Sequence, residues 1–230
     1  MNRRMFAGGL GAVLAASAVW GPGAVARAGR APMEVDRVAL GAGWLRLYPA
    51  EGRVVAHGAD GGVRWERSGL GLPRAAVVAG DRVWVSDAHG WVHGLDLQGN
   101  LVDRLAGFHQ PWGLVARPDG LHVADRLGHQ IVVVGPTGGR RTYGDGLNGP
   151  AGLAADGDRT WVADGGHERV VCLDRAGRLI QELRAPFLWR PRAVAVVGDR
   201  IHTHAAVPAV EVVFQRGGRV LAVEPLRGEA

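Results

Sequence analysis

Short apolar runs of four to six residues make up most of the chain, and glycine, aspartate and proline interrupt them. The stretch LPRAAVVAGDRVWVSD, residues 72–87, shows the pattern, with two apolar runs on either side of a Gly-Asp turn. Runs of this length between turn residues are typical of β-strands, and no window sustains the period of an amphipathic helix. The pattern predicts an all-β protein.

The pattern itself repeats along the chain. Each clear copy opens at a proline, and these prolines are Pro73, Pro111, Pro150 and Pro191, separated by 38, 39 and 41 residues. Every copy continues through a second apolar run and a glycine turn into a final run, which gives four strands per unit. A unit of about 40 residues with four strands is typical of a β-propeller blade.

A weaker copy with the same four runs precedes these units, between Val35 and Trp65. Five units then fill residues 33–226, which predicts one domain, a single β-propeller of five four-stranded blades. Each blade of such a ring packs between two neighbours, so both faces of its sheet are covered. Because the first unit is degenerate, a count of six blades stays open.

Two units carry a recognisable motif. In Gln110–Gly138 and Gly149–Gly177 the stretches VADRLGHQIVVV and VADGGHERVVCL follow a Pro-x-Gly-Leu opening. These units resemble NHL-repeat propellers, and the resemblance covers about four of the five units. It implies the propeller fold. Proteins of that kind act as interaction platforms, as RNA-binding surfaces and, in some relatives, as lyases or lactonases, so the resemblance does not choose a function.

Three aspartates, Asp87, Asp125 and Asp164, follow the second strand of successive units. Matched positions in different blades lie far apart around the ring, so we expect a structural role, in which each carboxylate accepts backbone hydrogen bonds and fixes the next loop. Cys172 is the single cysteine, which excludes an internal disulfide, and its apolar surroundings predict a buried side chain.

Residues beside the blade-opening prolines differ from unit to unit, as expected where loops converge on one ligand. The candidate binding residues at this axial face are Arg74, His109, Trp112, Asn148, Trp189, Arg190 and Arg192. Arginines with tryptophans suit an anionic or aromatic-bearing ligand, either a small molecule or a protein partner. The sequence therefore predicts a binding module that acts through its axial face.

The stretch IHTHA, residues 201–205, offers a second kind of chemistry. His202 and His204 would share one face of a strand and, with His109, are weak candidates for a metal site. His202 occupies a slot held by Trp84, His122 and Trp161 in the other units, which favours packing. His204 instead replaces a small residue, and Ala205 replaces the aspartate, so the last unit breaks the repeat twice.

An enzyme is the alternative function, a metal-dependent hydrolase or lyase of the propeller class. The resemblance argues against two kinds of propeller enzyme. Amidating lyases of this family carry a histidine after the blade-opening proline, where this chain has Arg74, Trp112, Ala151 and Arg192. Lactonase-like propellers surround an axial cation with acidic and asparagine side chains, and only Asn148 fits. Catalysis and any cofactor stay open.

The first 28 residues are predicted to be an export signal. Arg3 and Arg4 precede an apolar stretch, small residues such as Ala26 and Ala28 offer a cleavage site, and the order Arg-Arg-Met-Phe resembles a twin-arginine signal. We expect a periplasmic or secreted protein with no membrane span after cleavage. A structural accessory to a redox or envelope complex is a third possible function. Without Arg3 and Arg4 the net charge is +3 (25 − 22), too small to favour a nucleic-acid partner.

Overall fold

The computed structural model describes residues 37–226, and the predicted export signal, residues 1–28, lies outside them. Twenty strands form five antiparallel sheets of four, and the strands of each sheet follow one another in chain order. The all-β prediction and the count of five blades are confirmed. The degenerate first unit forms a complete sheet, although its sequence matches the other four only weakly.

The strands have the following bounds. The first blade contains β1 (Arg37–Leu40), β2 (Gly43–Tyr48), β3 (Arg53–His57) and β4 (Val63–Arg67). The second contains β5 (Pro73–Ala79), β6 (Arg82–Asp87), β7 (Trp91–Asp96) and β8 (Leu101–Leu105). The third contains β9 (Pro111–Arg117), β10 (Gly120–Asp125), β11 (Gln130–Val134) and β12 (Arg140–Tyr143). The fourth contains β13 (Pro150–Asp156), β14 (Arg159–Asp164), β15 (Arg169–Leu173) and β16 (Leu179–Leu183). The fifth contains β17 (Pro191–Val197), β18 (Arg200–Ala205), β19 (Val210–Gln215) and β20 (Val220–Pro225).

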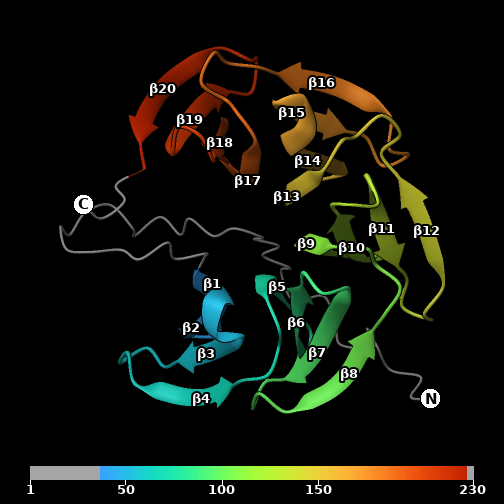
Figure 1. The fold of residues 1–230 in the computed structure, drawn as a ribbon, viewed down its shortest axis with the longest axis vertical. Helices are drawn as coiled ribbons and strands as arrows, with labels where there is room; N and C mark the ends of the chain where they lie inside the picture. Colours follow the sequence, from blue (N-terminus) through green and yellow to red (C-terminus); the bar gives the residue numbers. More distant parts are fainter. Residues whose placement is uncertain (1–36, 227–230) are drawn as a thin grey trace.

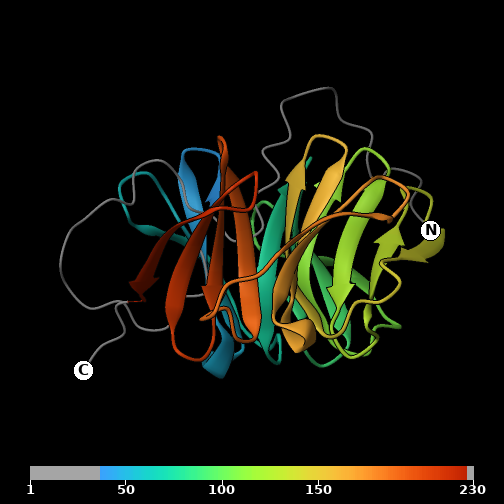
Figure 2. The ribbon, with the colours of Figure 1, turned by 90° about the horizontal axis from the view of Figure 1, so that it is seen from above.

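The five sheets stand around a central axis (Figure 1). The first strand of each blade lies nearest the axis and the fourth lies at the periphery, and the side view shows the blades standing next to one another (Figure 2). In blades two to five the innermost strand begins at the proline seen in the sequence repeat. We call the end of the propeller at which these strands begin the axial face.

The hydrophobic core is divided into four clusters, one at each junction between successive blades. Trp84 of the second blade belongs to one cluster with Leu121 of the third, and Trp161 of the fourth belongs to another with Ile201 of the fifth. Because side chains alternate across a strand, each sheet contributes one set of residues to the junction before it and another to the junction after it.

The innermost strands approach one another closely enough to require glycine. A Cβ added at Gly152 in β13 would lie 2.6 Å from the Cα of Ala193 in β17. Gly113 in β9 has the same relation to β13, where an added Cβ would lie 2.3 Å from the carbonyl oxygen of Ala151. The Pro-x-Gly opening of these two units therefore allows backbone contact between neighbouring blades near the axis.

The junction between the fifth and the first blade differs from the other four. Within residues 37–226 no strand of the fifth blade packs on the first blade as closely as successive blades pack on each other. The side of β18 and β19 turned away from the fourth blade carries His202, His204 and Glu211 in place of apolar residues. The helices of the described chain are two three-residue 3₁₀ turns, η1 (Pro49–Glu51) and η2 (Gly165–His167), and neither could cross a membrane.

Candidate anion-binding site

The axial face brings together an indole and two guanidinium groups. Trp112 follows the first residue of β9, and the guanidinium carbon of Arg74, from β5 of the preceding blade, lies 4.4 Å from the centre of its ring. Arg126, in the turn after β10, places its own guanidinium carbon 4.8 Å from the same ring. Cation–π attraction to the indole therefore holds two like charges close to each other.

Arg190 and Arg192, which flank the opening proline of the fifth blade, add their charges to this group. Burial and the charges of Arg192 and Arg126 lower the pKa of Arg74. Burial and the charges of Arg190 and Arg192 likewise lower the pKa of Arg126. Arg74 of the second blade and Arg126 of the third thus both feel positive charge from the fifth blade.

The positive charge of this group has little compensation. Within residues 37–226, none of these four guanidinium groups lies within 4.0 Å of a carboxylate. Arg126 donates one hydrogen bond to the side-chain oxygen of Gln110, 3.0 Å away, and the buried Nε of Arg74 has no acceptor among the described residues. Like charges held together in partly desolvated surroundings are destabilising, and a bound anion would relieve the repulsion.

We define the axial arginine cluster as Arg74, Trp112, Arg126, Arg190 and Arg192. All of these residues except Arg126 were predicted from the sequence. A signal for Arg126 exists in the repeat, because the residue after the second-strand aspartate is small in the second and fourth blades, where it is Ala88 and Gly165.

The repeated aspartates hold the segments that lead to the cluster residues. The backbone N–H groups of Leu72, Gln110 and Asn148 donate to Asp87, Asp125 and Asp164 over 3.0, 2.7 and 2.7 Å. The expected structural role is therefore present, but these bonds mainly fix the segment that enters the first strand. Only Asp87 also accepts a backbone hydrogen bond from the following loop, from the N–H of His89 over 3.0 Å.

The fifth blade lacks this carboxylate next to the cluster. Ala205 takes its position and pairs directly with Pro191, as Asp125 pairs with Pro111 in the third blade. Arg190 has a φ of 50°, a left-handed conformation that is costly for a residue with a side chain and unusual before proline. The break in the repeat thus removes a negative charge at the point where two arginines approach the axis.

Three other predicted residues lie on the rim outside the stack. The side chain of His109 is 70% exposed, and its Nδ1 lies 3.2 Å from Asp125. Asn148 is tied by its backbone to Asp164, and Trp189 is half exposed and accepts a backbone hydrogen bond from Ala206. They could contact a ligand larger than the cluster itself.

The metal prediction receives no support from the geometry of the described residues. Nδ1 of His202 lies 2.8 Å from Glu211, and Nε2 of His204 lies 4.0 Å from the same carboxylate oxygen. Within residues 37–226, no three histidine, cysteine, aspartate or glutamate side chains are arranged to hold a metal ion. His109, in the third blade, pairs with Asp125 and does not join the other two histidines.

Cys172 is fully buried, and this burial raises the pKa of its thiol to about 11. A thiol with so high a pKa is almost wholly protonated near neutral pH and is a poor nucleophile. The prediction of a buried, apolar role for this residue is confirmed.

Comparison with known proteins yields structural neighbours only. No protein-family model matches the chain, and no curated protein matches it by sequence. Virginiamycin B lyase from Staphylococcus aureus, solved as an inactive H270A variant with quinupristin, has a TM-score of 0.66 and 12% identity over 80% of this chain and 67% of its own. A streptogramin B lyase structure has a TM-score of 0.63 and 12% identity over 85% of this chain and 84% of its own.

A nidogen/laminin complex also contains a similar chain, with a TM-score of 0.64 and 20% identity over 80% of this chain and 74% of its own. These neighbours thus include both a lyase and a module that binds another protein. At such low identity the likeness concerns the fold, because sites with different chemistry are built on the same propeller. The comparisons therefore show that this chain is a β-propeller.

Proposed function

We propose that this protein is a binding module, an exported propeller of the NHL type that takes an anionic ligand on the axial arginine cluster. The observation that carries the proposal is the stack of Arg74 and Arg126 on one indole, with the charges of Arg190 and Arg192 nearby and no carboxylate within 4.0 Å in the described chain. The stack on Trp112 fixes two of these groups before any ligand arrives, which lowers the entropic cost of binding. The ligand carries at least two oxyanion groups, either on a small molecule or on an acidic segment of a protein partner.

Isothermal titration calorimetry with citrate and with pyrophosphate tests this proposal. We expect Arg126→Gln to weaken binding of at least one of the two anions about tenfold or more, because one charge-assisted contact is worth about 1.5–3 kcal/mol. The matched control is Arg219→Gln, which removes the same charge from an exposed position in the turn between β19 and β20. Equal binding by the two variants, or no binding by the parent protein, would contradict the proposal.

Thermal unfolding of the same variants separates a binding role from a structural one. Arg126→Gln relieves repulsion with Arg190 and Arg192, so without ligand it should unfold at the same or a higher temperature than the parent. The parent should then gain more thermal stability from citrate or pyrophosphate than the variant does. A variant that is simply less stable, with or without the anion, would indicate that Arg126 supports the fold.

Export is the second part of the proposal. Its support is the Arg3-Arg4-Met5-Phe6 order before an apolar stretch, which resembles a twin-arginine signal. Cell fractionation and N-terminal sequencing of the mature protein test it, and an intact Met1 in the cytoplasmic fraction would overturn it. The alternative of a metal-dependent hydrolase or lyase has no comparable group of residues behind it in the described chain.

A further inference from the structure

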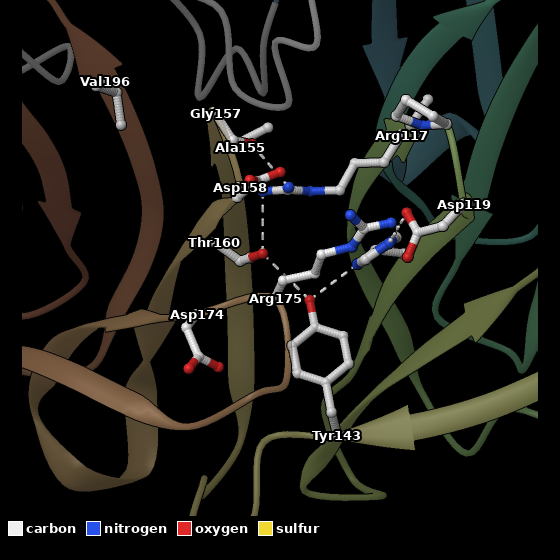
Figure 3. Close-up of a pocket in the computed structure, with 13 residues that line it drawn as sticks. Arg117, Asp119, Tyr143, Ala155, Gly157, Asp158, Thr160, Asp174, Arg175 and Val196 are labelled. Atoms are coloured by element: carbon white, nitrogen blue, oxygen red, sulfur yellow. Dashed lines mark hydrogen bonds and ion pairs between the residues drawn. The ribbon is translucent and has the colours of Figure 1, made fainter.

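A cavity of about 590 Å³ lies between the third and fourth blades at the end of the propeller opposite the axial face (Figure 3). In the third blade its walls come from the end of β9, the turn that follows, β10 and β12. In the fourth blade they come from β13, β14 and the turns β13–β14 and β15–β16, and Val196 of β17 adds a contact from the fifth blade. The cavity is separate from the axial arginine cluster, because β9 runs from Pro111 at the axial face to Arg117 at the cavity.

The wall of the cavity is a continuous chain of polar side chains. Nε2 of His122 lies 3.0 Å from Asp119, and its Nδ1 lies 2.8 Å from the hydroxyl of Tyr143. That hydroxyl shares a hydrogen bond of 3.3 Å with the hydroxyl of Thr160, which in turn accepts one of 3.1 Å from Arg117. Figure 3 shows Tyr143, Thr160 and Arg117 joined in this way across the two blades.

The same positions are apolar at the neighbouring junctions. The junction between blades two and three holds Trp84, Leu105 and Leu121, and the junction between blades four and five holds Trp161, Leu183 and Ile201. All six side chains are buried. Here the matching residues are His122, Tyr143 and Thr160, which are buried as well. The substitution of an imidazole for an indole also leaves space that the larger ring would fill.

A gain in folding stability does not readily explain why His122, Tyr143 and Thr160 together replace apolar residues at this junction. Replacement of buried polar partners by apolar groups of the same shape is often neutral or stabilising, and a buried polar group is costly when any of its bonds is unmet. Three changes at one junction, on two blades, therefore indicate a use for polar groups at this place. The prediction that His122 is a packing residue like Trp84 was incomplete, since its two nitrogens bond to Asp119 and Tyr143.

The protons of the chain have one consistent arrangement. Burial lowers the pKa of His122, so the ring is neutral at neutral pH. Bonds from His122 and Arg141 outweigh burial and lower the pKa of Asp119, so its carboxylate accepts the Nε2 proton. Nδ1 then accepts the Tyr143 proton, and the Tyr143 oxygen is left as an acceptor for Thr160.

Five charged side chains line the cavity, namely Arg117, Asp119, Asp158, Asp174 and Arg175. Arg117, Asp119 and Asp174 are held by hydrogen bonds to other residues of the chain, which leaves Arg175 and Asp158 for a ligand. Both of these side chains are exposed, and within residues 37–226 neither forms an ion pair or a hydrogen bond. Ala116, Ala155 and Val196 supply an apolar part of the wall. A cation, an anion and an apolar surface around one space match a small molecule that carries a carboxylate, an ammonium group and a hydrocarbon part.

We propose that this cavity is a second ligand site, which takes a small zwitterion of the amino-acid type. Arg175 binds its carboxylate, Asp158 binds its ammonium group, and the hydroxyls of Tyr143 and Thr160 form the polar wall of the site. The proposal is independent of the anion site, because no residue is shared between the two.

Calorimetric titration of the full-length protein with the twenty free amino acids tests the proposal. We expect at least one to bind with a Kd of about 1 mM or tighter, and its N-acetyl and amide derivatives to bind at least about tenfold more weakly. Arg175→Gln and Asp158→Asn change exposed groups, so they should keep the fold and weaken binding by a similar factor. Arg126→Gln, at the other end of the propeller, should bind the amino acid as the parent does.

The triple variant H122W/Y143L/T160I copies the junction between blades four and five into this one. We expect it to fold and to lose amino-acid binding while it keeps its response to citrate or pyrophosphate. If the triple variant does not fold, the amino-acid affinities of Arg175→Gln and Asp158→Asn test the proposal instead. Absence of binding by every amino acid, or undiminished binding in these two variants, would overturn the proposal.

Discussion

Asp125 illustrates how a single side chain fixes the rim of this propeller. Its carboxylate is almost fully buried and accepts hydrogen bonds from the backbone N–H groups of His109 and Gln110, over 3.0 and 2.7 Å. These two residues lead into β9, on which Trp112 stands. The position of the indole therefore depends on the Asp125 carboxylate, which holds the backbone just before β9.

Replacement of Asp125 by alanine would leave two backbone donors without their acceptor. We expect Asp125→Ala to lower the free energy of unfolding by about 2–3 kcal/mol, since each partly buried donor loses a charge-assisted bond. Urea denaturation measures this change. Asp81→Ala is the control, because that side chain is 81% exposed, and its effect should stay within about 0.5 kcal/mol. A similar loss in both variants would argue against the anchoring role.

At the same scale, the sequence predicted four of the five cluster residues because they break the repeat beside an identifiable proline. It could not predict that Arg74 and Trp112 stack, since they lie in different blades and 38 positions apart. The cavity between the third and fourth blades could not be predicted from the sequence either. His122 was compared with tryptophan as a ring that fills a slot, and its bond to Tyr143 depends on a strand whose register no repeat motif fixes.

At the scale of elements, the strands and their grouping into blades followed from the period alone. The faces of the strands could be assigned too, because alternation places Trp84 and Trp161 on the same side of equivalent strands. The close packing of the inner strands at the axis was harder to predict from the sequence. It depends on how closely two backbones approach, and only Gly113 and Gly152 indicate this in the sequence.

Gly152 gives a direct test of the contact between inner strands. We expect Gly152→Ala to destabilise the protein by about 2 kcal/mol or more, because the new methyl group would meet the backbone of Ala193 and neither strand can yield. Gly139→Ala is the matched control, since an added Cβ there meets nothing within 4 Å. Thermal unfolding of both variants measures the difference. Equal melting temperatures would show that β13 and β17 can separate without cost.

At the scale of the whole molecule, the ring gathers charges that are scattered along the chain. Arg74 and Arg192 are 118 positions apart, and Arg126 lies between them on another blade (192 − 74). Burial and the charge of Arg192 lower the pKa of Arg74 and of Arg126, and this charge reaches them because the blades converge on one axis. The fold thus creates the positive axial face, although the net charge of the described chain is modest.

The repeat also suggests how this charge is preserved. In three blades an aspartate ends the second strand, and in the fifth blade Ala205 stands next to Pro191 instead. Restoration of the aspartate would supply an acceptor for the backbone N–H of Trp189, as Asp164 does for Asn148 in the fourth blade. It would also place a negative charge beside Arg190 and Arg192. An aspartate at position 205 should therefore raise the free energy of unfolding and lower the affinity for the anion.

We expect Ala205→Asp to raise the free energy of unfolding by about 1 kcal/mol, the value of one added hydrogen bond, and to weaken citrate or pyrophosphate binding about tenfold. Ala205→Asn is the matched control, because its side chain can accept the same bond without a charge, and it should keep the affinity of the parent. Urea denaturation and calorimetric titration measure the two effects. If the Asp and Asn variants bind the anion equally well, the missing carboxylate has no part in the ligand site, and the alanine of the last blade needs a purely structural reason.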